Sequence, residues 1–256
     1  MAKYGVLGLM AGAAVLAGAP AGAATYPGNQ GRSWADIAKL PQITGVYELA
    51  AMDRVGRVPG ADGLQRNAPP ELAPKAAAEL AAYKAKGAQD TDAANCLPPG
   101  MPGVMTQPYP IQVLVTPGEV TIIQEAYMQV RHVHTDGRDH PADPDLTFNG
   151  DSIGHWEGDT LVVDTVGLAP QAVLQQGVTH SKNEHIVERF RLSDPNMLEV
   201  KTTITDPGVL AKPWETTTRY ARHPEWSIAE YICEQNNRNS FENGKAGLDL
   251  EFKKAQ

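Results

Sequence analysis

From Ile111 onward, apolar and polar residues alternate with a period of two, which is the spacing of the two faces of a β-strand. Turn sequences separate the runs, such as PG at 117–118, EG at 157–158 and DPN at 194–196. The runs are IQVLVT, EVTIIQE, YMQVRHVHT, SIGHWE, DTLVVDT, EHIVERFRL, NMLEVKTTIT, TTTRYARH and IAEYIC. About eight or more strands joined by tight turns close into a barrel, because closure removes exposed sheet edges. The sequence therefore predicts a mainly β fold, an antiparallel up-and-down barrel with short N-terminal helices.

The first residues have the pattern of a secretory signal peptide. Lys3 supplies the positive start, residues 5–18 are apolar, and AGA at 21–23 is a small-residue cleavage signature. The apolar stretch is too short and too rich in glycine to make a good membrane anchor. We therefore predict a signal peptide over residues 1–23 and a periplasmic or secreted protein.

The remaining chain shows no long linker that would divide it. Residues 24–110 are expected to pack on the barrel as helices over 33–40 and 70–86, a first strand near 43–51, and a proline-rich segment over 97–110. The barrel core is predicted over 111–235 and a polar tail over 236–256. The proline-rich segment is expected to lie over a surface or to form the lip of a cavity, and whether it is a mobile lid stays open.

The charge of the chain indicates which classes of partner it binds, and its cysteine content indicates the compartment in which it folds. The net charge of −8 includes Lys3, so the chain without its signal peptide carries about −9 (−8 minus one), and no basic cluster stands out. Nucleic acid and membrane insertion are not expected, whereas a small-molecule substrate or ligand is. The two cysteines, Cys96 and Cys233, are predicted to form a disulfide in an oxidising compartment. The oligomeric state is left open.

A carboxylate and several histidines fall on apolar strand faces. Glu188 shares its face with Ile186 and Phe190, whereas Arg189 and Arg191 point away. His132 and His134 share a face with Met128 and Val130, and are predicted to point into the barrel; His155 lies with Ile153. A buried carboxylate near an imidazole can act as general acid and base near neutral pH, although a satisfied polar network inside the barrel is the alternative. The catalytic candidates are Glu188, His132, His134, His155 and His185.

The loop after the histidine strand, TDGRDHP, supplies candidate substrate contacts. Arg138 carries a fork of donors that suits a carboxylate or phenolate, or pairs with Asp136 to order the loop. We predict that Arg138 and His140 lie at the open end of the barrel, beside His132 and His134. A hairpin tip facing water is the alternative. The substrate-binding candidates are Asp136, Arg138, His140 and Tyr109, the last from the proline-rich segment.

Metal and covalent chemistry have weaker support. HVH at 132–134 is a possible metal-binding pair, but the glutamate that follows His-x-His in the metal enzymes called cupins is replaced here by TDGR. A metal-dependent barrel enzyme using His132 and His134 is therefore kept only as an alternative. Nucleophile elbows, phosphate loops and dinucleotide fingerprints are absent from the sequence, and no cofactor is predicted.

The stretch GDSIGHWEGDTLVVDT admits two interpretations. Glu157, Gly158 and Asp159 suit a tight turn, in which glycine adopts a positive φ angle and Asp159 holds the turn. His155, Glu157, Asp159 and Asp164 also resemble a cluster of catalytic side chains. We predict a turn and carry forward His155 alone as a site candidate.

The run TDGRDHPADPDLTFNGDSIGHWEGDTLVVDT, together with LPQITGVYE, NCLPPGMP, EHIVERFR, TDPGVLAKPW and YICEQNN, resembles a widespread group of exported bacterial proteins, abundant in sphingomonads and soil bacteria. Members of this group often carry Tyr at the position of His134 and Arg at that of His132. The resemblance leaves Asp136, Arg138, His140, His185 and Glu188 as the better-matched polar positions, and implies no particular reaction. TGVYE is also similar to the Gly-x-Trp opening of lipocalin-like barrels, which implies a lipocalin or calycin type of barrel.

These observations support different classes of function. The leading hypothesis is an exported enzyme, a lyase, isomerase or hydrolase, that performs cofactor-independent acid–base chemistry on a small apolar or aromatic molecule. The alternatives are a periplasmic lipocalin-like carrier of an apolar ligand, the metal-dependent enzyme, and an envelope interaction protein with an exposed apolar patch.

Overall fold

The computed structural model describes residues 33–50, 69–85, 96–175, 178–233, 239–242 and 245–248. The predicted signal peptide, residues 1–23, lies outside the described residues. Among the described residues, no helix is long and apolar enough to cross a membrane.

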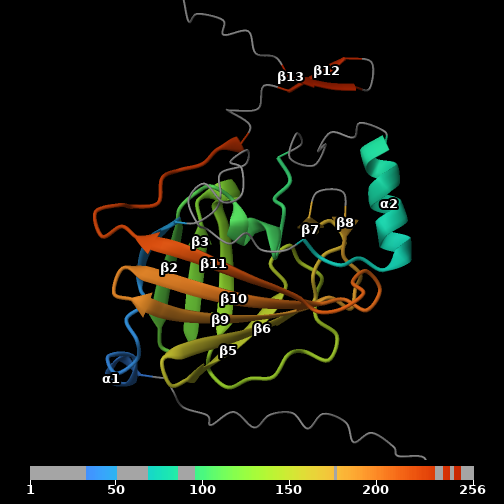
Figure 1. The fold of residues 1–256 in the computed structure, drawn as a ribbon. Helices are drawn as coiled ribbons and strands as arrows, with labels where there is room; N and C mark the ends of the chain where they lie inside the picture. The colour runs from blue at the N-terminus through green and yellow to red at the C-terminus, as the bar shows by residue number, and fades with distance from the viewer. Residues whose placement is uncertain are drawn as a thin grey trace, which may run out of the picture.

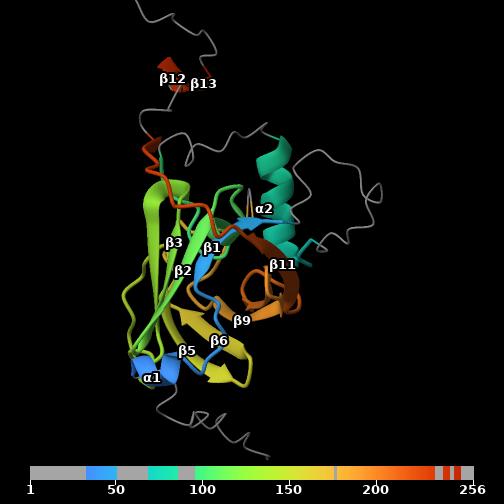
Figure 2. The same cartoon turned by 90° about the vertical axis from the view of Figure 1, so that its left-hand side faces the viewer.

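The core of the molecule is a closed barrel of nine strands, in the order β1-β11-β10-β9-β6-β5-β4-β3-β2, and Figures 1 and 2 show it from two sides. The predicted mainly β barrel is therefore confirmed. The strands are β1 (Gly45–Leu49), β2 (Ile111–Thr116), β3 (Glu119–Gln124), β4 (Gln129–His134), β5 (Asp151–Glu157), β6 (Thr160–Val166), β9 (His185–Asp194), β10 (Met197–Thr205) and β11 (Trp214–Arg222).

One pair of neighbouring strands departs from the predicted up-and-down order. β4 and β5 are parallel, with Val133 opposite Ser152 and His134 opposite Ile153. A parallel pair requires a crossover connection, because the chain must return to the end at which the first strand began. Residues 135–150 make this connection, and the barrel is mixed rather than purely antiparallel.

The prediction of a last strand at 228–233, IAEYIC, is wrong. This segment contains no strand; β1 pairs with both β11 and β2 and so closes the barrel without it. The backbone N–H of Ala229 instead donates to Glu125 at 2.9 Å.

Short elements cover the barrel. Helix α1 (Trp34–Ile37), shorter than the predicted helix over 33–40, is capped by Ser33 and buries Ile37. The 3-10 helix η1 (Gly103–Thr106), from the proline-rich segment, covers the end at which β2 begins and buries Val104 and Met105. Another 3-10 turn, η2 (Ala126–Met128), joins β3 to β4.

Helix α2 (Pro74–Ala85) lies on the other side of the barrel from α1 (Figures 1 and 2). It begins later than the predicted residue 70, because the chain before it bridges Leu72 to Leu210. Two short strands, β7 (Val173–Gln175) and β8 (Val178–Thr179), form a hairpin between β6 and β9. Within the predicted polar tail, β12 (Asn239–Glu242) and β13 (Lys245–Leu248) pair as an antiparallel hairpin.

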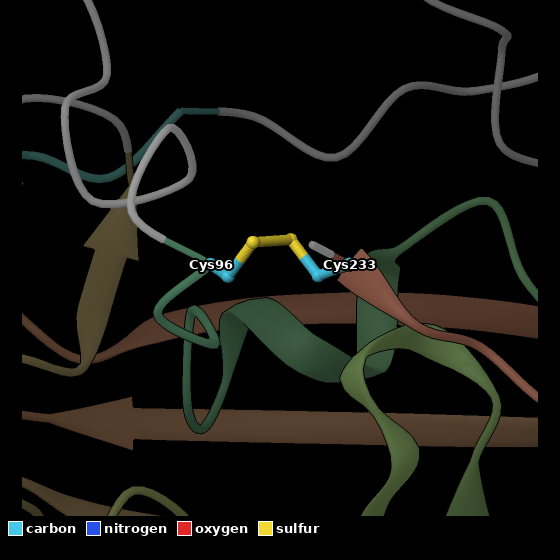
Figure 3. Close-up of a disulfide and its surroundings, with 2 residues drawn as sticks. All are labelled: Cys96 and Cys233. Atoms are coloured by element: carbon cyan, nitrogen blue, oxygen red, sulfur yellow. A yellow bond between two sulfur atoms is a disulfide. The ribbon is translucent and has the colours of Figure 1, made fainter. Parts of the chain in front are cut away.

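The predicted disulfide is present. Cys96 and Cys233 are joined by a bond between their sulfur atoms (Figure 3). The two residues are 137 positions apart in the sequence, and their Cα atoms lie 5.7 Å apart. The bond links the start of the proline-rich segment to the chain that follows β11. Every barrel strand except β1 therefore lies inside the loop that this bond closes.

Candidate functional site

A cavity of about 220 Å³ lies inside the barrel, at the end covered by η1. Its wall comes from the inward-facing residues of β10 and β11, and its cover comes from the proline-rich segment. Of the two positions expected for this segment, the lining residues agree with the one at the lip of a cavity. The lining residues are Pro102, Gly103, Met105, Thr106, Leu174, Glu188, Val200, Thr202, Ile204, Trp214, Thr216, Thr217, Thr218 and Tyr220.

A polar row crosses the inner wall of this cavity. Glu188 of β9 lies directly opposite Thr202 of β10, which in turn lies opposite Thr216 of β11. Val200 and Ile204 stand on either side of Thr202 on the same face of β10. The cavity is therefore mainly apolar, with one carboxylate and neighbouring hydroxyl groups along one line.

Glu188 forms a buried ion pair with Arg131 of β4. The Nη2 atom of Arg131 lies 2.6 Å from Oε2 of Glu188, and each side chain is 1% exposed. The guanidinium also donates through Nη2 to Thr165 at 2.7 Å and through Nε to Ser152 at 3.2 Å. Each charge therefore has a partner, which a buried ionised group requires.

The predicted burial of Glu188 is confirmed, but the predicted partner was wrong. We expected His132 and His134 to point into the barrel with Met128 and Val130. Instead Arg131 and Val133 are buried, and His132 has a side chain 56% exposed. The physical reason is the ion pair: Glu188 neutralises Arg131, which allows a charged residue to occupy the interior face.

Tyr220 is the second ionisable group in the cavity wall. Its hydroxyl donates to the backbone carbonyl of Met105 at 2.5 Å and so ties β11 to η1. Burial raises the pKa of Tyr220, and the nearby carboxylate of Glu188 adds to this effect. Tyr220 is therefore a neutral phenol at every physiological pH.

Two other site candidates, His140 and His185, meet on the outer face of the barrel. Nδ1 of His140 lies 2.5 Å from Asp151, and its Nε2 lies 3.2 Å from Oδ1 of Asp164. The same Oδ1 atom lies 2.7 Å from Nε2 of His185. The crossover connection thus brings His140 onto β5, β6 and β9. We call these four residues, His140, Asp151, Asp164 and His185, the outer cluster.

The charges of the outer cluster stabilise one another. Hydrogen bonding to Asp164 raises the pKa of both His140 and His185, and Asp151 adds to the effect at His140. Burial by itself would raise the pKa of Asp164, but the hydrogen bonds with the two imidazoles outweigh it and hold that pKa well below its usual range. The cluster fixes the crossover connection to the barrel wall.

The outer cluster predicts a pH-dependent stability. The contribution of the histidines is complete below their usual pKa of 6.5 and is lost as the pH rises through the raised values. That of Asp164 is complete above 3.8 and is lost only as the pH falls through its lowered pKa. Replacing Asp164 with Asn should therefore lower the free energy of unfolding by about 1–2 kcal/mol near pH 5, and by clearly less near pH 9.

Urea unfolding at the two pH values measures this difference. Asp143→Asn, an exposed change in the same crossover connection, is the matched control and should have almost no effect. An equal loss for Asp164→Asn at both pH values would contradict an ionic role for the cluster.

Arg138 and His140 do not line the cavity, so their predicted position at its mouth is wrong. The prediction that Arg138 lies on the side of His134 agrees with the charge interaction between His134 and Asp136, the ion-pair partner of Arg138. Arg138 is exposed and pairs with Asp136 through Nη2 at 2.6 Å, which orders the turn after β4. Hydrogen bonding from Arg138 lowers the pKa of Asp136. The structure therefore agrees with the alternative prediction, in which Arg138 pairs with Asp136 and orders its own loop.

The other histidine candidates face outward, each beside a carboxylate. Nδ1 of His132 lies 2.9 Å, and that of His134 3.9 Å, from the carboxylate of Glu119 on β3. His155 lies 3.1 Å from Glu157.

Gly158 has a φ of 61°, which confirms the predicted turn. No group of three or more His, Cys, Asp or Glu side chains within the described residues is arranged to hold a metal ion.

Tyr109 belongs to an aromatic cluster rather than to the cavity wall. Its ring packs edge-on against Tyr231 at 5.2 Å between centroids, and Tyr127 lies 5.5 Å from Tyr231. These contacts join the proline-rich segment to the chain just before Cys233.

Sequence reasoning missed Arg131, Thr202, Thr216 and Tyr220. The last three were recognisable as residues of alternating strands, since each lies on the same face as an apolar neighbour, but threonine and tyrosine are common in any strand. Arg131 gave no signal, because an arginine in a strand normally faces water.

No protein-family model and no curated protein matches this chain.

Proposed function

We propose that this protein binds a small, mainly apolar molecule inside its barrel and carries it unchanged. The observation that supports this is the cavity of about 220 Å³, which has a mainly apolar surface and is covered by the proline-rich segment. An apolar cavity on the order of 150 Å³ accommodates benzene. The cavity therefore suits a molecule about the size of a substituted single ring.

The same geometry favours carriage over the acid–base reaction that the sequence suggested first. Among the described cavity-lining residues, Glu188 and Tyr220 are the only ionisable side chains; Oε2 of Glu188 pairs with Arg131, and the hydroxyl of Tyr220 donates to the carbonyl of Met105. The histidines expected to act with Glu188 lie outside the barrel. An acid–base enzyme remains the second candidate, since a carboxylate in an apolar cavity is able to accept a proton.

Native mass spectrometry of the protein purified from its own exported fraction distinguishes the two candidates. We expect a bound small molecule at one per chain that is recovered unchanged after long incubation. A bound molecule that is converted during incubation would support the enzyme instead.

A cavity-filling substitution supplies a second test. Thr216→Phe should lower the affinity for single-ring compounds by at least about tenfold, because the larger side chain occupies the ligand space, while costing about 1–3 kcal/mol of stability. Isothermal calorimetry measures the affinity. Thr203→Phe, on the outward face of β10, is the matched control and should bind as the unchanged protein does. Equal binding by both variants would place the ligand elsewhere.

The compartment forms part of the proposal. The Cys96–Cys233 disulfide is typical of proteins that fold outside the reducing cytoplasm, and the predicted signal peptide points the same way. We propose that binding takes place in the periplasm or outside the cell.

A further inference from the structure

The pairing of the Glu188 carboxylate with Arg131 limits which molecules the cavity can bind. Its Oε2 atom is fully buried, 2.6 Å from Nη2 of Arg131. Glu188 lines the cavity, and Oε1 is not among its buried atoms without a partner, so Oε1 is inferred to be the oxygen that faces the cavity. A carboxylate oxygen accepts hydrogen bonds and donates none, so the polar end of the cavity requires a donor.

Charge balance excludes ionised ligands. Arg131 and Glu188 together carry no net charge, and both are 1% exposed. No other ionised side chain is present among the described residues that line the cavity. An anionic ligand would lie beside the carboxylate without a counter-ion, and an ammonium ligand would add a positive charge that only an already paired carboxylate could balance. Burial of such charges is strongly unfavourable.

The surroundings of Glu188 favour a hydroxyl group. Thr202 lies opposite Glu188 in the strand register, and Thr216 lies opposite Thr202. Threonine hydroxyls both donate and accept, so they complement a ligand O–H that donates to Oε1 and accepts in return. Leu174, Ile204 and Trp214, which also line the cavity, offer apolar contact to the rest of the molecule.

We propose that the cavity selects neutral, single-ring molecules bearing a hydroxyl group, such as phenols and cyclic alcohols, and that Glu188 is the residue that determines this selection. The inference rests on the proposed binding function. A hydrocarbon of the same size would leave Oε1 without a partner, and that loss is expected to weaken its binding by about tenfold or more.

Calorimetric titration of the intact protein with four probes of similar size tests this selection. The probes are 4-methylphenol, toluene, 4-methylbenzoate and benzylamine, at a pH where the last two are ionised. We expect 4-methylphenol to bind one per chain, about tenfold or more tighter than toluene, and the two ionised probes to bind more weakly than toluene. Toluene binding as tightly as 4-methylphenol, or tighter binding of either ionised probe, would overturn the selection and leave the binding function intact. No saturable binding of any probe would overturn both.

Two variants test whether Glu188 and Thr202 determine the preference for a hydroxyl-bearing ligand. Glu188→Gln should reduce the preference for 4-methylphenol over toluene by about threefold or more, because a neutral amide is a weaker acceptor than a carboxylate. Thr202→Val keeps the side-chain shape and does not disturb the ion pair, so it remains informative if Glu188→Gln fails to fold. It should reduce the same preference about twofold or more while leaving the affinity for toluene unchanged. An unchanged preference in Thr202→Val would contradict the assignment.

Discussion

Removal of the Cys96–Cys233 disulfide should lower the free energy of unfolding by about 5 kcal/mol. The bond spans a sequence separation of 137 residues and encloses β2 to β11. In the loop-entropy model, a cross-link restricts the unfolded chain more strongly as the loop that it closes becomes longer. The expected loss is comparable to the whole stability of many domains.

Urea unfolding of the oxidised protein, the reduced protein and the double variant Cys96→Ser/Cys233→Ser measures this loss. The reduced protein and the double variant should agree, and a reducing agent should leave the double variant unchanged. The native contacts beside the bond contribute little, since the adjacent Leu97 and Ile232 are each 38% exposed. A loss below about 1 kcal/mol would mean that the unfolded chain is already compact without the bond.

The sequence predicted the barrel because its strands bury one face and expose the other. β2 has the predicted limits, Ile111–Thr116, and the turn at Gly158 has the positive φ angle that its sequence requires. In β9, Ile186, Glu188 and Phe190 are all buried, as the alternation indicated. Periodicity is reliable in such strands because the apolar residues all lie on one face.

The same reasoning failed in β4, because its apolar residues lie on both faces. Val130 is 42% exposed and Val133 is fully buried, so hydrophobicity alone does not determine which face points inward. The decisive partner of Arg131 is Glu188, which follows it in the chain by many residues and belongs to a different strand. A contact of that kind depends on the closed barrel and is not visible in a local pattern.

The outer cluster also could not be predicted from local sequence patterns. His140 and His185 were chosen from the sequence, but Asp164, whose Oδ1 atom lies within 3.2 Å of a ring nitrogen of each, was not chosen. Their meeting depends on the parallel pairing of β4 and β5, which sends the crossover connection along the outside of the barrel. The expected up-and-down order of strands gave no reason to place His140 against β6.

Replacing Arg131 with methionine should destabilise the protein by about 3–5 kcal/mol, because the change leaves the Glu188 carboxylate buried without a counter-ion. Arg138→Met is a matched control, since Arg138 and Asp136 form an ion pair with the same 2.6 Å separation on the surface. That control should cost no more than about 1 kcal/mol, because water replaces the lost partner. Urea unfolding of both variants gives the comparison, and equal losses would show that Glu188 is not desolvated.

The double variant Arg131→Met/Glu188→Leu separates stability from binding. Replacing both members of a buried ion pair with apolar residues is often neutral or stabilising, so this variant should recover most of the 3–5 kcal/mol lost in Arg131→Met. If it does, the ion pair is not required for folding. Its carboxylate then has a different role, and we expect the stable double variant to bind toluene at least as tightly as 4-methylphenol. A double variant that is stable and still prefers the phenol would show that another group selects the ligand.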